Sequence, residues 1–357
     1  MNAAERTVAH LDADAFYVSV ELLRRPELRG LPVVVAGTGP RSVVTTASYE
    51  ARQFGVGSAI PAARARRLCP QAVFLAPDFK AYRAASAELM GIVRGSVDVV
   101  EVVGLDEAYL DLTGLYAPRA AMRRLVREIR GRTGITCSVG IGPNKLVAKV
   151  ASDAEKPAGF LALTREEACV RFAGASPRLV PGIGPRTAEA LASMGITTLA
   201  ALAAADEGRL VERFGVNQGA ALARRARFEH DGAVSEERKV VSESRERTFD
   251  RDISYAGDLQ AALERMAVEL CESLERHGRS GRTIAIKVRL DDFTTVTRAH
   301  TLEQATRAAD VVTSEALRLL REYDPPRPVR LLGVRVAGLE SDGAPAATGE
   351  DQLAFEV

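Results

Sequence analysis

The order of strands and helices in the first part of the chain constrains its fold more than any other feature. Short apolar runs with β-branched residues predict strands at 7–11, 99–103, 108–112 and 137–141. Helical spacing predicts helices at 16–23, 81–97, 119–130 and 144–152. This β-α-β-β-α-β order predicts a ferredoxin-like sheet.

The remaining segments indicate several further domains. A breaker-rich insertion at 18–78 carries strands at 32–36 and 42–47 and a helix at 62–69. An Ala-rich helical stretch covers 166–230, a polar tether covers 231–242, and strands then alternate with helices at 259–277 and 302–323. From 340 the sequence turns to Gly, Ala, Pro and acidic residues, which is typical of a tail. We therefore expect an α+β multidomain chain.

Composition excludes several classes of protein. The chain has 357 residues and is 46% hydrophobic, too rich in core formers for a disordered protein. Its 48 basic and 47 acidic side chains give a net charge of +1, which excludes a uniformly cationic nucleic-acid binder. The four cysteines form no CxxC pair, so neither a zinc site nor a disulfide framework is indicated and a reducing cytoplasm fits. No apolar run predicts export or a membrane span.

Acidic residues follow two of the predicted strands. Asp12 and Asp14 end the first strand, and Asp106 and Glu107 lie at the bend of the predicted hairpin. Three carboxylates around one point need cations, and a pair of magnesium ions bridged by carboxylates can activate a hydroxyl and neutralise a leaving pyrophosphate. By spacing alone, ordinary solvated turns are the more frequent explanation.

Four motifs favour a metal site over ordinary turns. They occur along the chain in the order DADAFYVSVE, TTASYEARQFGV, GLDEAYLDL and NKLVAKVASDAEKP. Together they resemble the Y-family translesion DNA polymerases, in the DNA polymerase IV branch, over residues 8–339. The resemblance implies a low-fidelity, template-directed DNA polymerase that extends primers past damaged bases from dNTPs and releases pyrophosphate. It also implies a palm at 1–17 and 79–166, fingers at 18–78, a helix-hairpin-helix thumb at 167–232, a linker at 233–242, a little finger at 243–340 and a flexible tail at 341–357.

The resemblance assigns the metal ligands. Asp12, Asp106 and Glu107 match the metal-binding carboxylates, with Asp106 and Glu107 also catalytic, and Ala13 matches a backbone-carbonyl ligand. Two Mg²⁺ ions per site are implied, with Mn²⁺ as an alternative. Asp14 is not carried over as a ligand.

The resemblance also assigns nucleotide contacts. Tyr17 matches the steric gate that excludes a 2′-hydroxyl, although spacing alone favours a core tyrosine. Tyr49 and Arg52 share one face at a predicted helix start, where an anion is favoured. The implied nucleotide-binding set is Phe16, Tyr17, Thr46, Tyr49, Arg52 and Lys149. Lys145 is interpreted as a surface lysine.

Two segments predict contacts with the DNA backbone. The turn VPGIG, followed by a helix, resembles a helix-hairpin-helix and would direct backbone N–H groups at a phosphate, although most such turns are structural. One strand alternates apolar with basic residues, and further arginines lie on other predicted strands. The predicted DNA-binding residues are Gly182, Gly184, Lys287, Arg289, Arg298, Arg330 and Arg335.

The sequence also leads to expectations about binding partners and leaves two alternative functions to be tested. We expect a cytoplasmic monomer that binds primer-template DNA and dNTPs and no membrane. The tail residues Gln352, Leu353 and Phe355 form an incomplete match to a sliding-clamp peptide. Because so short a match also arises by chance, clamp binding and coincidence both remain as alternatives. A nucleotidyl cyclase or signalling domain would use a similar sheet without thumb or little finger. A non-catalytic DNA-binding protein of this shape would lack one of the three carboxylates.

Overall fold

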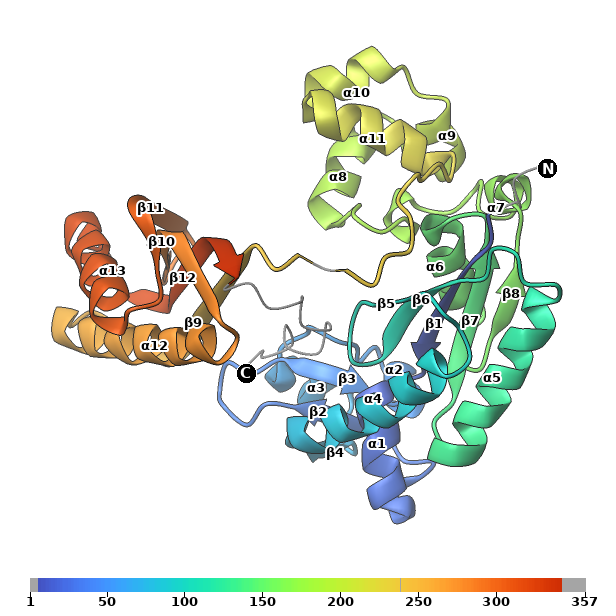
Figure 1. Ribbon diagram of the computed structural model, residues 1–357, viewed down its shortest axis with the longest axis horizontal. Helices are drawn as coiled ribbons and strands as arrows, with labels where there is room; N and C mark the ends of the chain where they lie inside the picture. Colours follow the sequence, from blue (N-terminus) through green and yellow to red (C-terminus); the bar gives the residue numbers. More distant parts are fainter. Residues whose placement is uncertain (1–5, 238, 342–357) are drawn as a thin grey trace. The chain divides into compact units, whose positions relative to one another are not determined.

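The computed structural model describes residues 6–237 and 239–341 and forms two compact units (Figure 1). The first contains 6–33, 46–50 and 77–236, and the second contains 34–45, 51–76 and the described residues from 237 to 341. This division by contacts is coarser than the division into palm, fingers, thumb, linker and little finger, which stays a prediction.

A five-stranded sheet with the order β5-β6-β1-β7-β8 forms the centre of the first unit. Its strands are β1 (Val8–Ala13), β5 (Val100–Val102), β6 (Glu107–Asp111), β7 (Cys137–Gly142) and β8 (Phe160–Ala162). Strand β1 pairs antiparallel with β6 and β7, and β8 runs parallel to β7. The predicted strands and hairpin are confirmed, and β8 is an additional strand.

Helices cover both faces of this sheet. They are α1 (Phe16–Arg24), α4 (Phe79–Arg94), α5 (Pro118–Thr133) and α6 (Lys145–Ala154). Side chains alternate along β1, so Leu11 lies on the apolar face with α4 and α5, while His10 and Asp12 lie on the face with α6. Asn144 begins α6 by accepting a hydrogen bond from the Val147 N–H.

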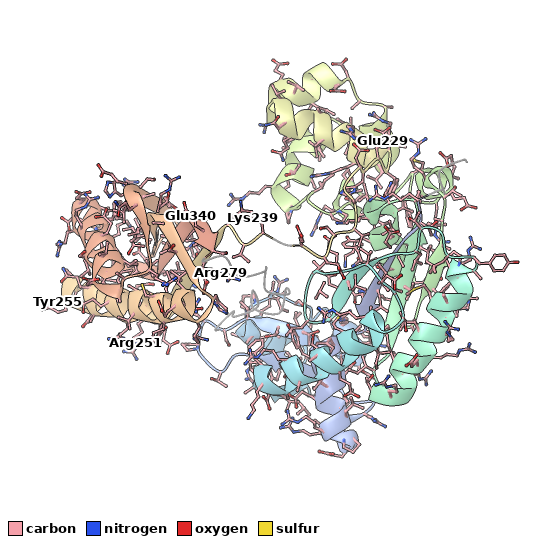
Figure 2. All side chains as sticks on the ribbon, viewed as in Figure 1. Glu229, Lys239, Arg251, Tyr255, Arg279 and Glu340 are labelled. Carbon is pink, nitrogen blue, oxygen red and sulfur yellow. The ribbon has the colours of Figure 1, made fainter. Side chains whose placement is uncertain are left out.

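Residues 165–226 of the first unit form a succession of short helices, in agreement with the helical stretch predicted at 166–230. These elements are α7 (Arg165–Arg171), η2 (Pro177–Leu179), α8 (Pro185–Ser193), α9 (Leu199–Ala203), α10 (Glu207–Phe214) and α11 (Val216–Ala226). Leu191, Leu202, Leu210 and Leu222 are fully buried in their core. After α11, Glu229 lies 3.6 Å from Arg165 of α7, which ties the end of the helical part to its beginning (Figure 2).

The second unit contains a four-stranded antiparallel sheet with the order β11-β10-β12-β9. Its strands are β9 (Ser242–Ile253), β10 (Arg279–Leu290), β11 (Thr295–Thr306) and β12 (Val329–Ser341), and its helices are α12 (Ala256–Arg276) and α13 (Ala309–Tyr323). Ile284, Ile286 and Val288 point into one core with both helices. Arg279, labelled in Figure 2, lies on β10 with its guanidinium 3.5 Å from Glu243 of β9.

One predicted boundary in this unit is wrong. The helix predicted at 302–323 begins only at Ala309, and residues 302–306 belong to β11. Pairing with β10 explains the difference, since Thr301 and Thr306 lie opposite Thr283 and Gly281. The Thr306 hydroxyl then accepts from the Ala308 N–H, which separates strand from helix.

The 18–78 insertion forms a small sheet with the order β3-β2-β4. Its elements are η1 (Pro26–Leu28), β2 (Val33–Ala36), β3 (Val44–Ala47), α2 (Tyr49–Arg52), α3 (Ala62–Leu68) and β4 (Val73–Leu75). The predicted strands and helices are confirmed, and β4 is additional.

Candidate active site

The β5–β6 hairpin brings the predicted carboxylates to the end of β1. Asp12 and Glu107 are direct partners across the β1–β6 ladder. The Ala13 N–H donates to the Asp106 carbonyl oxygen at 2.8 Å, which holds the bend against the strand end. Three carboxyl-bearing residues therefore meet at one edge of the sheet.

Two lysines lie among these carboxylates. The Lys149 ammonium, on α6, is 2.7 Å from Glu107 Oε2 and 3.3 Å from Asp12 Oδ2. The Lys156 ammonium is 2.6 Å from Asp12 Oδ1 and 2.8 Å from Asp153 Oδ1. Burial acts to lower the pKa of both lysines, but the neighbouring carboxylates outweigh it and raise both pKa values.

The pKa values of the adjacent residues Asp106 and Glu107 are shifted in opposite directions. Burial, followed by repulsion from Asp12 and Glu107, raises the pKa of Asp106 to about 6. The contact with His10, supported by Lys149, lowers the pKa of Glu107 to about 2 although burial opposes this. Of these two adjacent acids, Asp106 is thus the one whose ionised form is disfavoured, first by burial and then by its charged neighbours.

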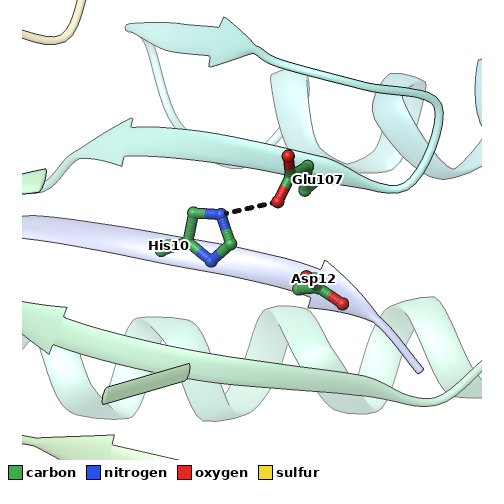
Figure 3. A group of neighbouring side chains, drawn as sticks. All are labelled: His10, Asp12 and Glu107. Carbon is green, nitrogen blue, oxygen red and sulfur yellow. Dashed lines mark ion pairs between the residues drawn. The ribbon is translucent and has the colours of Figure 1, made fainter. Parts of the chain in front are cut away.

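His10 is a fully buried member of the site that sequence reasoning missed (Figure 3). Its Nε2 lies 3.2 Å from Glu107 Oε2, and its Nδ1 lies 2.8 Å from the Ser152 hydroxyl oxygen. Since that hydroxyl donates to the Lys149 carbonyl oxygen at 2.8 Å, it accepts from His10, and the Nδ1 carries a proton. A carboxylate only accepts, so the contact with Glu107 is attractive when Nε2 is protonated as well. Burial lowers the pKa of His10, and the contact with Glu107 opposes this.

Donor atoms of His10, Asp12 and Glu107 lie within 4.8 Å of one another, close enough to hold one metal ion (Figure 3). His10 could have been found from the sequence by its position two residues before Asp12. Residues at i and i+2 of a strand share a face. Lys156, the other missed residue, lies beyond the end of α6, where no periodicity links it to β1.

Asp14 has a different environment. It is 2% exposed, and its Oδ1 accepts from the Ser138 hydroxyl at 2.7 Å while its Oδ2 accepts from the Ala158 N–H at 2.8 Å. Both oxygens therefore join β1 to β7 and to the segment before β8. This arrangement agrees with leaving Asp14 out of the ligand set.

The predicted steric gate lies on α1. Tyr17 packs against Tyr82, with ring centroids 4.7 Å apart, and against Phe79 at 6.1 Å. Burial and then the negative charge of Asp106 raise the pKa of the Tyr17 phenol, so the phenol lies within electrostatic reach of that carboxylate. Phe16 is 1% exposed, and its side chain belongs to the core.

The other predicted nucleotide contacts lie on the insertion. Thr46 is buried on β3, Tyr49 begins α2, and the exposed Arg52 ends it. Tyr49 and Arg52 therefore belong to one short helix, as the sequence predicts.

The predicted DNA-binding turn precedes α8. Gly182 has φ +88°, and a Cβ there would lie 2.8 Å from an Arg225 guanidinium nitrogen, so both conformation and space favour glycine. Gly184 is the N-cap of α8, and Ile183 between them is buried. The backbone conformation and the close packing of the turn therefore account for the glycine at position 182.

The basic residues of the second unit lie on two faces of its sheet. The strand register places Lys287, Arg289 and Arg335 on the face away from α12 and α13. Arg298 lies opposite Ile286 on the helix-covered side, with its guanidinium carbon 5.1 Å from the Tyr323 ring centroid.

Two of the basic residues have close neighbours on their own unit. Lys287 lies 2.8 Å from Glu246 Oε2 on β9, which neutralises part of the basic face. Arg330, at an irregular position of the ladder, lies over the Phe293 ring at 4.6 Å.

Comparisons with known proteins identify the family. Residues 11–153 match the model of the impB/mucB/samB family, and residues 240–350 match the C-terminal domain of that family. Residues 179–229 match a SAM-like helix-hairpin-helix tandem. The chain belongs to the impB/mucB/samB family, the Y family of DNA polymerases.

Relatives agree with this assignment of the Y-family chain. DNA polymerase IV of Streptomyces coelicolor is 43% identical over 93% of this chain and 71% of its own length. DNA polymerase IV of Xanthomonas campestris pv. campestris is 39% identical over 99% of both chains, and that of Methanoculleus marisnigri is 38% identical over 95% of this chain and 96% of its own.

Solved structures agree as well. A Y-family DNA polymerase chimera, Dbh-Dpo4(243-245)-Dbh, superposes with a TM-score of 0.84 at 26% identity, covering 94% of this chain and all of the other. An insertion ternary complex of Dbh DNA polymerase has a TM-score of 0.66 at the same identity and coverage.

Membership of the Y family confirms the predicted fold class and the predicted DNA-directed DNA polymerase activity, of the low-fidelity, translesion type. Y-family polymerases use divalent metals, and this chain has a suitable acidic group. The cyclase and non-catalytic alternatives are thereby set aside. In the described part of the chain, no helix is both long and apolar enough to cross a membrane.

Proposed function

We propose that this Y-family polymerase joins deoxynucleotides at Asp12, Asp106 and Glu107, with two Mg²⁺ ions, or Mn²⁺ as an alternative. The observation that carries the proposal is the convergence of these carboxylates at the end of β1, where Lys149 and Lys156 already lie as cations among them. Carboxylate oxygens are hard donors that suit Mg²⁺, and the Ala13 carbonyl at the same strand end adds a neutral one.

The bound ions would lower the pKa of the primer 3′-hydroxyl and neutralise the departing pyrophosphate. The protein's own residues prepare this site. Asp106 and Glu107 hold the oxygen ligands on a tight hairpin, and His10 packs behind Glu107 with its Nε2 3.2 Å from Glu107 Oε2. Lys149 is within reach of the same point and would stabilise the negative charge of the triphosphate.

One group of residues is proposed to select the sugar of the incoming nucleotide, and a second group is proposed to bind its triphosphate. Tyr17 would lie beneath the sugar and exclude ribonucleotides, with Phe16 contributing its backbone because its side chain is buried. Thr46, Tyr49 and Arg52 would bind the triphosphate, and a guanidinium suits phosphate oxygens through its fork of donors.

The polymerase is proposed to hold primer-template DNA through its phosphates. Backbone N–H groups at the turn before α8 and the basic sheet face would supply contacts without sequence preference. The residues in this proposal are Gly182 and Gly184 at the turn and Lys287, Arg289 and Arg335 on the basic sheet face, together with Arg298 from the helix-covered side and Arg330 from the irregular position of the ladder.

Primer extension by an Asp106→Ala protein tests the metal site. We expect extension on undamaged and lesion-bearing templates to fall by about a thousandfold or more, while DNA affinity measured by fluorescence anisotropy stays within about twofold. Asp98→Asn, an exposed acid ahead of β5, is the matched control and should extend primers normally. Extension by Asp106→Ala at the wild-type rate would remove the proposal.

The steric gate has its own test. Tyr17→Ala should raise incorporation of ribonucleotides relative to deoxynucleotides, because the ring no longer fills the space beneath the 2′ position. Tyr116→Ala, a fully exposed tyrosine, controls for the loss of a ring. An unchanged ratio in Tyr17→Ala would assign Tyr17 to the core alone.

Three further proposals concern the protein's surroundings. Gln352, Leu353 and Phe355 lie outside the described residues, and their docking to a sliding clamp is tested by deleting 351–357 and measuring clamp-dependent processivity. A monomer is tested by sedimentation. Cytoplasmic location is tested by fractionation of cells.

A further inference from the structure

A pocket of about 420 Å³ lies between α5 and the edge of the first unit's sheet. Three arginines of α5, Arg123, Arg127 and Arg130, line it together with Val126, Thr136 and Phe160. These arginines follow one another at helical spacing of four and three residues, so they share one face of α5. Figure 1 shows α5 running alongside β7 and β8 in this unit.

Charge is concentrated on this helix. Helix α5 carries six arginines and one glutamate, whereas the whole chain has a net charge of only +1. Arg132, outside the pocket, is paired with Glu128 at 3.1 Å. Among residues 6–237 and 239–341, no carboxylate forms an ion pair with any of the three pocket arginines. Their guanidinium groups are exposed and available to an external anion.

The pocket also offers an apolar and aromatic lining. The guanidinium of Arg123 lies over the Phe160 ring, 4.3 Å from its centroid, and Phe160 and Val126 are half-buried. Stacking on the ring holds Arg123 in place while its N–H groups remain free to donate. A ligand that fills this site therefore needs an apolar group as well as negative charge.

The pocket is separate from the polymerase site. Asp12 and Glu107 lie on the sheet face covered by α6, and α5 packs with α4 on the opposite face. DNA that presents its primer end to the carboxylates is therefore not directed at α5. A duplex also presents phosphates without a protruding apolar group, so it leaves the pocket unfilled.

We propose that this arginine pocket binds an acidic peptide segment of a partner protein, with a large apolar side chain inserted beside Phe160 and Val126. Carboxylates on either side of the anchor would pair with Arg123, Arg127 and Arg130. Charge complementarity and the apolar lining together favour a peptide over a nucleic acid. Such a contact would hold the polymerase to its partner while the carboxylate edge remains open.

Fluorescence anisotropy with a labelled peptide of several aspartates and one phenylalanine tests the proposal on the full chain. The variant R123Q/R127Q/R130Q removes the pocket charges, and R119Q/R124Q/R132Q removes the same charge from the rest of α5. We expect saturable binding to wild type, a loss of about tenfold or more in the first variant and a change within about twofold in the second. Primer extension should be unchanged in both, which shows that both fold.

Two altered probes separate the alternatives. A peptide with alanine for phenylalanine should bind about tenfold more weakly, and one with asparagine for aspartate should not bind measurably. Equal losses in the two triple variants would show that net charge alone acts and would overturn the proposal. So would a labelled single-stranded oligonucleotide that binds R123Q/R127Q/R130Q at least tenfold more weakly than wild type while binding R119Q/R124Q/R132Q normally, because the occupant would then be nucleic acid.

Discussion

Replacing Asp106 by asparagine should stabilise the first unit of the metal-free protein while abolishing primer extension. Asp106 lies at the bend between β5 and β6, where burial and then repulsion from Asp12 and Glu107 disfavour its ionised form. Asparagine keeps the size of the side chain and removes the charge. A gain in stability with a loss of activity is typical of a functional site under electrostatic strain.

The magnitude follows from the pKa of Asp106, which burial, Asp12 and Glu107 raise from 3.8 to about 6. A shift of about two units corresponds to a free energy on the order of 3 kcal/mol. Because the folded-state pKa lies above the unfolded one, the favourable contribution is complete below about pH 4 and is lost as the pH rises through 6. The advantage of Asp106→Asn should therefore be about 3 kcal/mol near pH 7.5 and about half of that near pH 5.

Urea unfolding in EDTA, read by limited proteolysis and mass spectrometry, gives the two units separate transitions. Peptides of β1 and β6 report on the first unit, and those of β10 and β12 serve as an internal control that should not respond. In millimolar Mg²⁺ the wild type should instead be more stable than Asp106→Asn, because the wild type binds the ions and the variant binds them weakly. A variant no more stable than wild type in EDTA, or an advantage that does not grow with pH, would refute the electrostatic reasoning.

Three further substitutions test neighbouring parts of the structure. His10→Ala should lower kcat by about tenfold with little change in DNA affinity, because Glu107 loses the side chain packed behind it, and His10→Gln, which fills part of that space, should restore part of the rate in the same extension assay. Glu246→Gln should strengthen DNA binding a few-fold at low salt and not at high salt, measured by anisotropy, since it frees Lys287; unchanged binding would show that Lys287 does not meet DNA. Asp14→Ala should lower the free energy of unfolding of the first unit by about 2–3 kcal/mol, and an equally stable variant would contradict its structural role.

The sequence allowed the palm-like sheet to be predicted, because its strands are short apolar runs separated by strong helical patterns. Strand β8 could not be predicted, since three residues after a Pro/Gly cluster are too few to show alternation. The beginning of α13 was misplaced because its apparent periodicity extends into β11, where pairing with β10 decides the conformation. Local patterns thus define elements well and their ends poorly.

The same limit applies to the candidate site. Motif resemblance predicts functional roles for Asp12, Asp106, Glu107 and Lys149, but the roles of their neighbours depend on contacts between distant segments. In the sequence, His10 is one polar residue in an apolar run, and only the β1–β6 register and the approach of α6 show that it lies against Glu107. Its supporting partner, Ser152, lies 142 residues away.

The charges of the cluster give a physical reason to expect divalent ions at the proposed site. Asp12, Asp106 and Glu107 face two lysines, and among the described residues both lysines contact Asp12 or Glu107 rather than Asp106. Both lysines also lie near Asp153, so they do not balance the carboxylates, and burial, followed by repulsion from Asp12 and Glu107, raises the pKa of Asp106. Two divalent ions bring four positive charges, which would neutralise Asp12, Asp106 and Glu107. Lys149 would then no longer be needed as a counter-charge for these carboxylates. The triphosphate supplies the negative charge that Lys149 then needs, so metal binding would free this lysine at the point where the substrate requires it.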